Sequence, residues 1–217
     1  MTAQALNQRI AHLEIPHRLR GLKVSDEGYP IPWFVADVGG KPEFRAFDSE
    51  KFGVAIRHRR CWLCGEQLGK YLNFCVGPMC CVTRTNGEPP CHRDCAEYAM
   101  RSCPFLSQPR MRRNEKNLPE GRLPPAGIAI QRNPGCNAIW TTESYKLFPD
   151  QNRRVLFSMG DPIEVRFFAQ GRAATRAEVM ESMRTGLPEL QKYAADDEGL
   201  AELRRMYNTA LTLLPPE

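Results

Sequence analysis

A cysteine-rich segment constrains this chain more than any other feature. Eight of the nine cysteines lie between Cys61 and Cys103, and two chelating pairs stand within that stretch: Cys61-x-x-Cys64 and His92-x-x-Cys95. Ligands three residues apart can bind one ion, because a tight turn or one helical turn brings their side chains together. A closed set of four thiolate and imidazole ligands is typical of structural zinc sites. The segment therefore predicts one structural Zn²⁺ per chain, bound by Cys61, Cys64, His92 and Cys95.

The remaining cysteines leave two alternatives open. A second metal ion or an iron–sulfur cluster could use the cysteines between the two pairs, but these lack another Cys-x-x-Cys pair. Their simplest interpretation is that of small buried hydrophobic residues. A protein without metal, whose thiols are buried or redox-active, is the other alternative. The residues concerned are Cys75, Cys80, Cys81 and Cys91; Cys103 and Cys136 are expected in the core.

The order of motifs in this segment predicts its local structure. Gly65 after the second cysteine permits a turn that aims backbone amides at the thiolates. A strand or hairpin is expected over residues 68–85, and Pro89-Pro90 then leads into a helix that begins at His92. A knuckle, a hairpin and a ligand-bearing helix resemble the treble-clef arrangement of many zinc modules. Three acidic residues near the helix start are candidates for orienting His92: Glu88, Asp94 and Glu97.

No catalytic constellation is readable in the chain. A hydrolytic zinc keeps one coordination position for water, whereas this segment offers four protein ligands. The deaminase pattern fails, because Asp94 stands where a second cysteine after Pro90-Cys91 is needed. An HNH-type nuclease needs a histidine base between the two ligand pairs, and none lies between Cys64 and His92. An enzyme of an unrecognised class stays a third alternative.

Composition indicates a folded protein outside the membrane. Hydrophobic residues make up 42% and charged residues 25% of the 217 residues, as in globular proteins. No apolar run approaches the ~20 residues of a membrane span, and the N-terminus lacks the apolar core of a signal peptide. We therefore expect a cytoplasmic protein that has no membrane partner, in which cysteines bind metal rather than form disulfides.

Basic charge concentrates around the cysteine-rich segment. Residues 57–132 hold 13 Lys or Arg against 6 Asp or Glu, a local excess of +7 in a chain whose net charge is +5. The plain interpretation is a solvated surface; the sharper one is a face that binds polyanions. The candidate phosphate contacts are Arg57, Arg59, Arg60, Arg93, Arg110, Arg112 and Arg113.

Local patterns predict the other elements. The apolar spacing in residues 1–20 predicts a short N-terminal helix, and residues 21–56 indicate strands and turns, with residues 52–56 as a strand. Short β-rich runs after residue 127 predict a small antiparallel sheet. Thr175 and Glu178 form a capping box before a helix with Val179, Met180 and Met183 inward. Gly186 is expected to end that helix, Pro188 to begin another, and an apolar face predicts a last helix near residues 200–214.

These predictions combine into an α+β fold. A treble-clef-like zinc module joins a small antiparallel β-rich part with C-terminal helices, and we expect one cooperative unit. The expected segments are an N-terminal helix with extended stretches (1–56), the zinc module (57–106), a loop or linker (107–127), and the β-rich part with its helices (128–217).

Several motifs resemble a group of uncharacterised proteins of bacteriophages and of prophage regions in bacterial genomes. They are CWLCG (61–65), GPMC (77–80), EPPCHRDCA (88–96), CPF (103–105), RNPG (132–135), IWTT (139–142) and ATRAEV (174–179). The resemblance covers most of the chain and implies a cytoplasmic, phage-related context. It supplies no catalytic residue. The group has residues other than cysteine at the positions of Cys75 and Cys91, which implies that these two are not ligands.

Two functions follow as hypotheses. The first is a phage-type accessory zinc protein that binds DNA or RNA through the basic face of its zinc module, with phosphate contacts rather than base readout. The second is a non-enzymatic factor that binds a host or phage protein through the linker and residues 110–113. Steep salt dependence would favour the first, and a stoichiometric protein complex the second.

Overall fold

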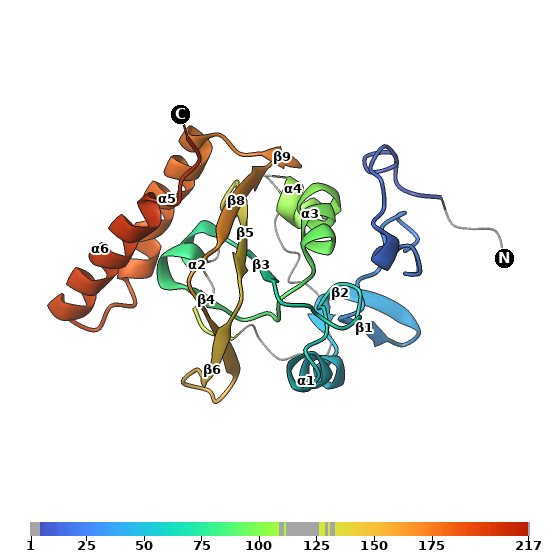
Figure 1. Ribbon diagram of the computed structural model, residues 1–217, viewed down its shortest axis with the longest axis horizontal. Coiled ribbons are helices and arrows are strands. Elements are labelled where there is room, and N and C mark those ends of the chain that lie inside the picture. Colours follow the sequence, from blue (N-terminus) through green and yellow to red (C-terminus); the bar gives the residue numbers. More distant parts are fainter. Residues whose placement is uncertain (1–4, 109–110, 112–125, 129, 131–132, 217) are drawn as a thin grey trace.

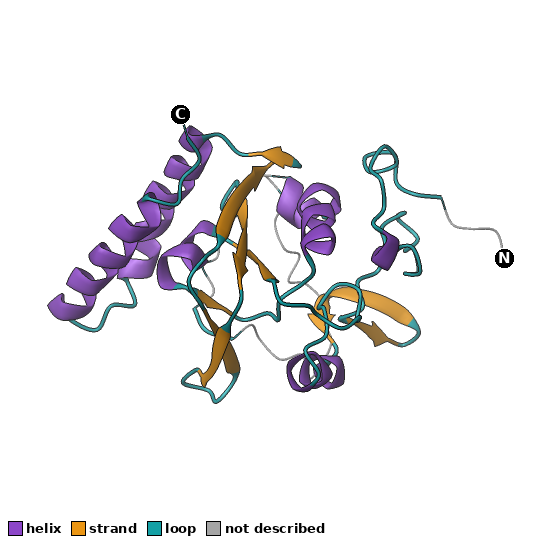
Figure 2. Ribbon diagram, in the orientation of Figure 1, coloured by secondary structure: helices purple, strands orange, loops and turns teal. Residues whose placement is uncertain are grey.

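The computed structural model describes residues 5–108, 111, 126–128, 130 and 133–216. The fold is mixed α/β, with antiparallel sheets and several helices (Figures 1 and 2). Short elements dominate the N-terminal half, and two long helices close the chain. In order they are η1 (His17–Leu19), β1 (Val35–Val38), β2 (Lys41–Phe47), α1 (Ser49–Arg57), β3 (Leu72–Val76), α2 (Pro78–Thr83), β4 (Thr85–Asn86), α3 (Arg93–Ser102), α4 (Pro104–Ser107), β5 (Asn137–Thr142), β6 (Tyr145–Pro149), β7 (Val155–Met159), β8 (Glu164–Ala169), β9 (Arg172–Ala173), α5 (Arg176–Gln191) and α6 (Asp197–Leu211).

Within the described part of the chain, the strands form three antiparallel sheets. β3, β5, β8 and β9 make a four-stranded sheet, β4, β7 and β6 a three-stranded one, and β1 pairs with β2 in a hairpin. Each larger sheet joins one strand from the cysteine-rich segment to strands from the C-terminal part. The antiparallel sheet expected after residue 127 therefore includes β3, which pairs with β5 over its whole length.

The core lies around β5. Every residue of β5 is buried, because β3 and β8 flank it and helices cover both faces. In Figure 1, α2, α5 and α6 lie on one side of the sheet and α3 and α4 on the other. Trp140, Phe74 and Phe157 are among the largest fully buried side chains. Burying each such side chain contributes about 1.5–3 kcal/mol to folding.

Helix α1 corrects the predicted strand at residues 52–56. Asp48 caps the helix: its carboxylate accepts hydrogen bonds from the amides of Glu50 and Lys51. Ala55 is buried, and Phe52 packs edge-on against Trp62. A short apolar run fits a strand and a helix equally well, and here the cap decides in favour of the helix.

The predicted break between two helices at Gly186 is also wrong. α5 continues from Arg176 to Gln191 through both Gly186 and Pro188. Its capping box at Thr175 and Glu178 forms as expected. Proline has no backbone N–H, so one carbonyl in the preceding turn lacks its hydrogen bond; because Pro188 is exposed, water can take that place. Gly186 is buried.

Smaller differences concern side-chain direction and the N-terminus. Val179 and Met183 are buried, whereas Met180 is 39% exposed rather than inward. Turns and the 3-10 helix η1 replace the expected N-terminal helix. The segment after β3 continues as helix α2, since Pro78 occupies a first-turn position, and not as the return strand of a tight hairpin.

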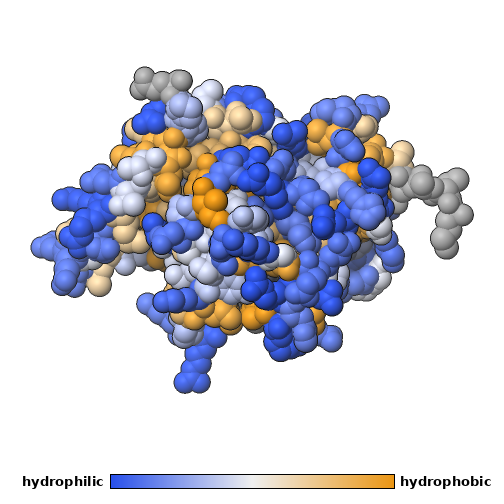
Figure 3. Space-filling model, in the orientation of Figure 1, coloured by the Kyte–Doolittle hydropathy of each residue, from blue (hydrophilic) through white to orange (hydrophobic). Residues whose placement is uncertain are grey.

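None of the helices within the described residues combines the length and the apolar character that crossing a bilayer requires. On the face that Figure 3 shows, hydrophilic residues surround smaller groups of apolar ones.

Candidate metal centre

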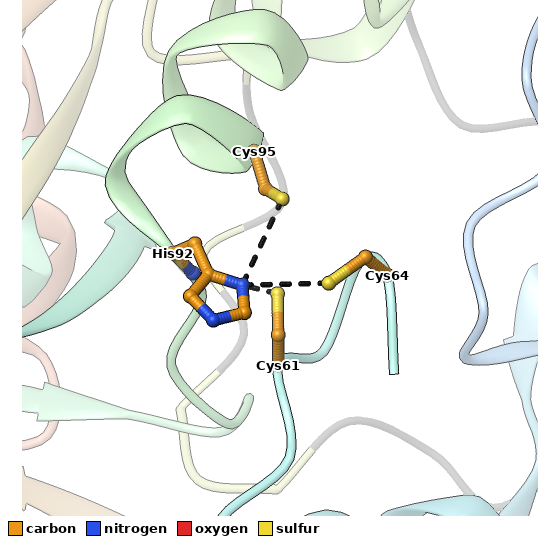
Figure 4. Close-up of side chains that lie close together, drawn as sticks. All are labelled: Cys61, Cys64, His92 and Cys95. Atoms are coloured by element: carbon orange, nitrogen blue, oxygen red, sulfur yellow. Dashed lines mark hydrogen bonds between the residues drawn. The ribbon is translucent and has the colours of Figure 1, made fainter. Parts of the chain in front are cut away.

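The four predicted ligands converge in the structure. Cys61 and Cys64 approach from the turn between α1 and β3, and His92 and Cys95 from the start of α3 (Figure 4). Their ligand atoms all lie within 4.8 Å of one another. Cys61 and Cys95 are fully buried, and Cys64 and His92 are partly exposed. This group could hold a metal ion.

The first ligand pair sits on a tight turn that backbone hydrogen bonds fix. The amide of Gly65 donates to the Cys61 carbonyl, and the amide of Cys61 donates to the Glu66 carbonyl, both at 2.8 Å. The amide of Glu66 reaches the Cys64 sulfur at 3.5 Å. Gly65 has φ +78°, a left-handed conformation that glycine adopts at little cost. The turn thereby points two sulfurs to one side, as the sequence predicted.

The second pair lies at the beginning of α3. His92 is the N-cap residue, and Cys95 follows in the first turn. The amide of His92 donates to the Cys61 sulfur at 3.4 Å. A helix N-terminus stabilises negative charge, so thiolates are favoured in this position.

Asn73 fixes the segment that leads into His92. It is 1% exposed, and its side-chain amide donates to the Cys91 carbonyl at 3.1 Å. Its side-chain oxygen accepts a hydrogen bond from the Thr141 hydroxyl at 2.8 Å. The buried network therefore ties the chain just before His92 to β3 and β5. Sequence reasoning did not single out Asn73, although a polar residue inside an apolar strand is a signal of such a role.

A carbonyl, and not an acidic side chain, orients the His92 ring. Nε2 lies 3.0 Å from the carbonyl oxygen of Gln67, which can only accept, so Nε2 carries the proton. Nδ1 is then the nitrogen that faces the thiols and would bind metal once it has lost its own proton; it lies 3.4 Å from the Cys64 sulfur and 4.0 Å from the Cys95 sulfur. A ring nitrogen hydrogen-bonded to a carbonyl is the usual support of a metal-binding histidine.

Two of the three acidic residues proposed as supports of His92, Asp94 and Glu97, bind arginines. Asp94 accepts from Arg18 at 3.2 Å, and Glu97 accepts from Arg166 at 2.5 Å. Arg18 also reaches Glu66 at 3.3 Å, so one guanidinium bridges the two ligand-bearing segments. The Arg18 side chain is 42% exposed, so solvent screens its ion pairs. Their contribution to the free energy of unfolding is therefore at most about 1 kcal/mol.

The spacing of the ligand atoms fits tetrahedral coordination. Ligands at ~2.3 Å (sulfur) and ~2.0–2.1 Å (nitrogen) from one ion stand about 3.5–3.8 Å apart. The two nitrogen–sulfur distances, 3.4 and 4.0 Å, lie on either side of that value. Separations within the group reach up to 4.8 Å, so side chains would move by about 1 Å to close four bonds around one ion.

The electrostatics of the group favour a cation. Hydrogen bonds from Cys64, and then from Cys91 and Cys95, lower the pKa of Cys61 far below its ordinary value. Hydrogen bonds with Cys61 and Cys64 raise the pKa of His92 to about 10. The neighbouring thiols donate to Cys61 and stabilise its thiolate, and this negative charge in turn stabilises the protonated form of His92. A divalent cation would neutralise the same charge.

An aromatic cluster supports the turn from inside. Trp62 stacks on Phe34, with ring centroids 4.8 Å apart, and meets Phe47 and Phe52 at 6.0 and 5.7 Å. Trp33 packs edge-on against Trp62 and also lies against Gly65. These residues hold the first ligand pair against the core, a contact that the sequence did not predict.

The other cysteines do not form a second metal group among the described residues. Burial raises the pKa of Cys80 to about 11, and burial together with neighbouring thiols raises that of Cys81. Cys91 is buried, and its pKa is raised by hydrogen bonds with Cys61 and Cys75. The raised pKa values keep these thiols neutral; Cys81 and Cys91 are buried, Cys80 is partly exposed, and Cys136 is fully buried.

The candidate phosphate contacts divide into three groups. Arg57 and Arg59 are exposed at the end of α1, and Arg60 is partly buried beside them. Arg93 forms an ion pair with Glu164, so its charge is already balanced. Three of the predicted contacts, together with most of the linker at 107–127, lie outside the described residues: Arg110, Arg112 and Arg113.

Comparison with protein-family models, curated proteins and solved structures finds no match to this chain.

Proposed function

We propose that Cys61, Cys64, His92 and Cys95 bind one structural zinc ion. Three thiolates and one imidazole are a ligand set that zinc prefers. Four protein ligands leave no position for a reactive water, which favours a structural role over a catalytic one. The support of the His92 ring by the Gln67 carbonyl is consistent with this proposal.

We further propose that the module is of the treble-clef type. Three features support this: the turn at Cys61–Cys64, the ligand-bearing start of α3, and the antiparallel bridge between Asn73 and Cys91. This bridge takes the place of the hairpin in a treble clef. The connection between its two strands contains α2 and β4, which makes it longer than a simple turn.

Purified protein is expected to contain one zinc per chain, because a single group of ligands converges among the described residues. Elemental analysis of protein prepared without added metal measures this number. Two metal ions per chain, or iron with a visible absorption band, would contradict the single-zinc proposal.

The function that we propose is nucleic-acid binding through the basic side of this module. The proposal is supported chiefly by three arginines directly before Cys61, namely Arg57, Arg59 and Arg60. No acidic side chain pairs with these three among the residues that the structure describes; Arg59 donates instead to the Gly69 carbonyl at 3.3 Å. Unpaired guanidinium groups on a rigid scaffold bind phosphates without reading bases. A phage-type accessory role, suggested by the resemblance of the motifs, is part of the same proposal.

A salt series tests this function. Arg57→Gln/Arg60→Gln should lower the slope of log affinity against log salt by about two for mixed-sequence DNA or RNA, since each phosphate contact contributes roughly one. Arg59 is left unchanged because its φ of +47° makes its replacement a test of backbone strain as well. Equilibrium binding across the series, for parent and variant, gives the slopes.

A matched control removes two charges elsewhere. Arg204→Gln/Arg205→Gln lies on α6, which Figure 1 places away from α1. Its slope should equal that of the parent. Absence of binding at low salt, or equal slopes for all three proteins, would remove the nucleic-acid proposal.

A protein partner is the second candidate. One observation favours it: β6 is an edge strand of its sheet and exposes Leu147 and Phe148 at 44% and 39%. An open edge with apolar side chains can pair with an extended segment of another protein. Isolation of a stoichiometric complex that Leu147→Lys disrupts, together with absent nucleic-acid binding, would make this candidate the leading one.

A further inference from the structure

A cavity of about 390 Å³ lies at the end of α3 opposite to His92 and Cys95. The N-terminal segment closes it against the end of α3, the end of α4 and the turn between β8 and β9. A volume of this size is typical of sites for small organic ligands, which span ~300–1,000 Å³.

The lining is cationic. Arg9 and Arg101 give it a formal charge of +2, His12 adds a ring with a further nitrogen donor, and no Asp or Glu belongs to the wall. Two planar guanidinium groups offer forked pairs of donors that match phosphate oxygens.

The acidic residues that would ordinarily balance these arginines are engaged elsewhere. Glu97 stands one helical turn before Arg101 and would be its natural partner on α3. It binds Arg166 instead, at 2.5 Å. Glu14, the acid nearest to Arg9 in sequence, lies 3.5 Å from Arg20. Both arginines therefore have no acidic partner among the described residues.

The other residues that line the cavity could contact the uncharged organic part of a phosphorylated ligand. Ile10 is 2% exposed, Leu13 packs against the core, and Tyr29 offers an aromatic ring. Neutral polar side chains, among them those of Ser102 and Gln170, can bond to hydroxyl groups. Gln170 and Gly171 both adopt positive φ (+53° and +75°), as in a two-residue β-hairpin turn.

We propose that this cavity binds a phosphate monoester attached to a compact organic group. A phosphate near a charge of −2 balances the two arginines, whereas a carboxylate would leave one of them unpaired. The phosphate can belong to a free nucleotide or to the 5′ end of a nucleic-acid strand, and the chemistry of recognition is shared. The site does not depend on Arg57 or Arg60, so its test is independent of the proposed function.

Calorimetric titration with adenosine 5′-monophosphate and with adenosine tests the proposal. The monophosphate should bind saturably, and adenosine should bind at least about tenfold more weakly, because it lacks the charged group. Arg101→Gln and Arg9→Gln should each weaken the monophosphate about tenfold or more, while Arg204→Gln on α6 should leave its affinity unchanged. Both arginines are exposed, so thermal unfolding of the variants should match the parent.

A 5′-phosphorylated trinucleotide and its unphosphorylated form separate the two sources. If only the monophosphate binds, the natural ligand is a free small molecule. If the phosphorylated trinucleotide also binds, the ligand is the 5′ end of a nucleic-acid strand. Absence of saturable binding by either phosphate, equal binding of adenosine, or unchanged affinity in both arginine variants would overturn the proposal.

Discussion

Cys95→Ser is expected to abolish zinc binding and to lower the unfolding temperature by more than ~10 °C. Structural zinc contributes on the order of 10 kcal/mol to small modules, which is comparable to the whole stability of a typical domain. In a chain of this size, each kcal/mol of lost stability lowers the melting temperature by ~2–4 °C, so a loss of several kcal/mol lowers it by more than ~10 °C. Cys95 is fully buried beside Cys61, so a serine there would also leave a polar group without its ion.

Chelation of the parent protein should have the same effect as the substitution. Calorimetry and zinc content, measured with and without a strong chelator, compare the two. Cys103→Ser is the control, because Cys103 follows the same helix, lies outside the ligand group and is only partly buried. Cys136 is less suitable as a control, since it is fully buried. A Cys95→Ser protein that melts at the parent temperature and retains zinc would show that Cys95 is not a ligand.

Gly65→Ala is expected to destabilise the protein by several kcal/mol and to weaken metal binding. Two separate costs add at this position. The φ of +78° is unfavourable for alanine by roughly 1–2 kcal/mol. A β-carbon would also lie 2.8 Å from the Trp33 ring, which is closer than van der Waals contact. Relief of that clash would move either the aromatic cluster or the turn that aims Cys61 and Cys64.

Two other glycines separate these costs. Gly39 has φ +63°, but no atom lies within 4 Å of the place where a β-carbon would stand, so Gly39→Ala should show the conformational cost alone. Gly69 has neither a positive φ nor a close neighbour, and Gly69→Ala should be nearly neutral. Denaturant unfolding of the three variants is expected to give the order Gly65, Gly39, Gly69 from largest to smallest loss. If the Gly65→Ala protein were as stable as the Gly39→Ala protein, the Trp33 ring would be able to move away from the new β-carbon without loss of stability.

The sequence alone identified the features that depend on residues close together in the chain. The pairs Cys61–Cys64 and His92–Cys95 could be recognised as chelating from spacing, and the structure brings all four together. The capping box at Thr175 and Glu178 is equally local, since one helical turn contains both partners. Most strands after residue 136 also lie where their β-rich runs predicted them. Such features are decided by a few neighbouring dihedral angles, so their signal survives in a short stretch of sequence.

Only the tertiary structure decided the features that join distant segments. The pairing of β3 with β5, the Gln67 carbonyl that orients His92, and the pairing of Arg93 with Glu164 each connect residues more than twenty positions apart. The same holds for the cavity, where an N-terminal arginine meets the end of α3. Even the course of α5 past Gly186 and Pro188 follows from packing, since its buried face contacts the core and its proline faces solvent. Contacts of this kind depend on the whole fold, because local propensity is weak compared with burial, and burial is known only once every segment is in place.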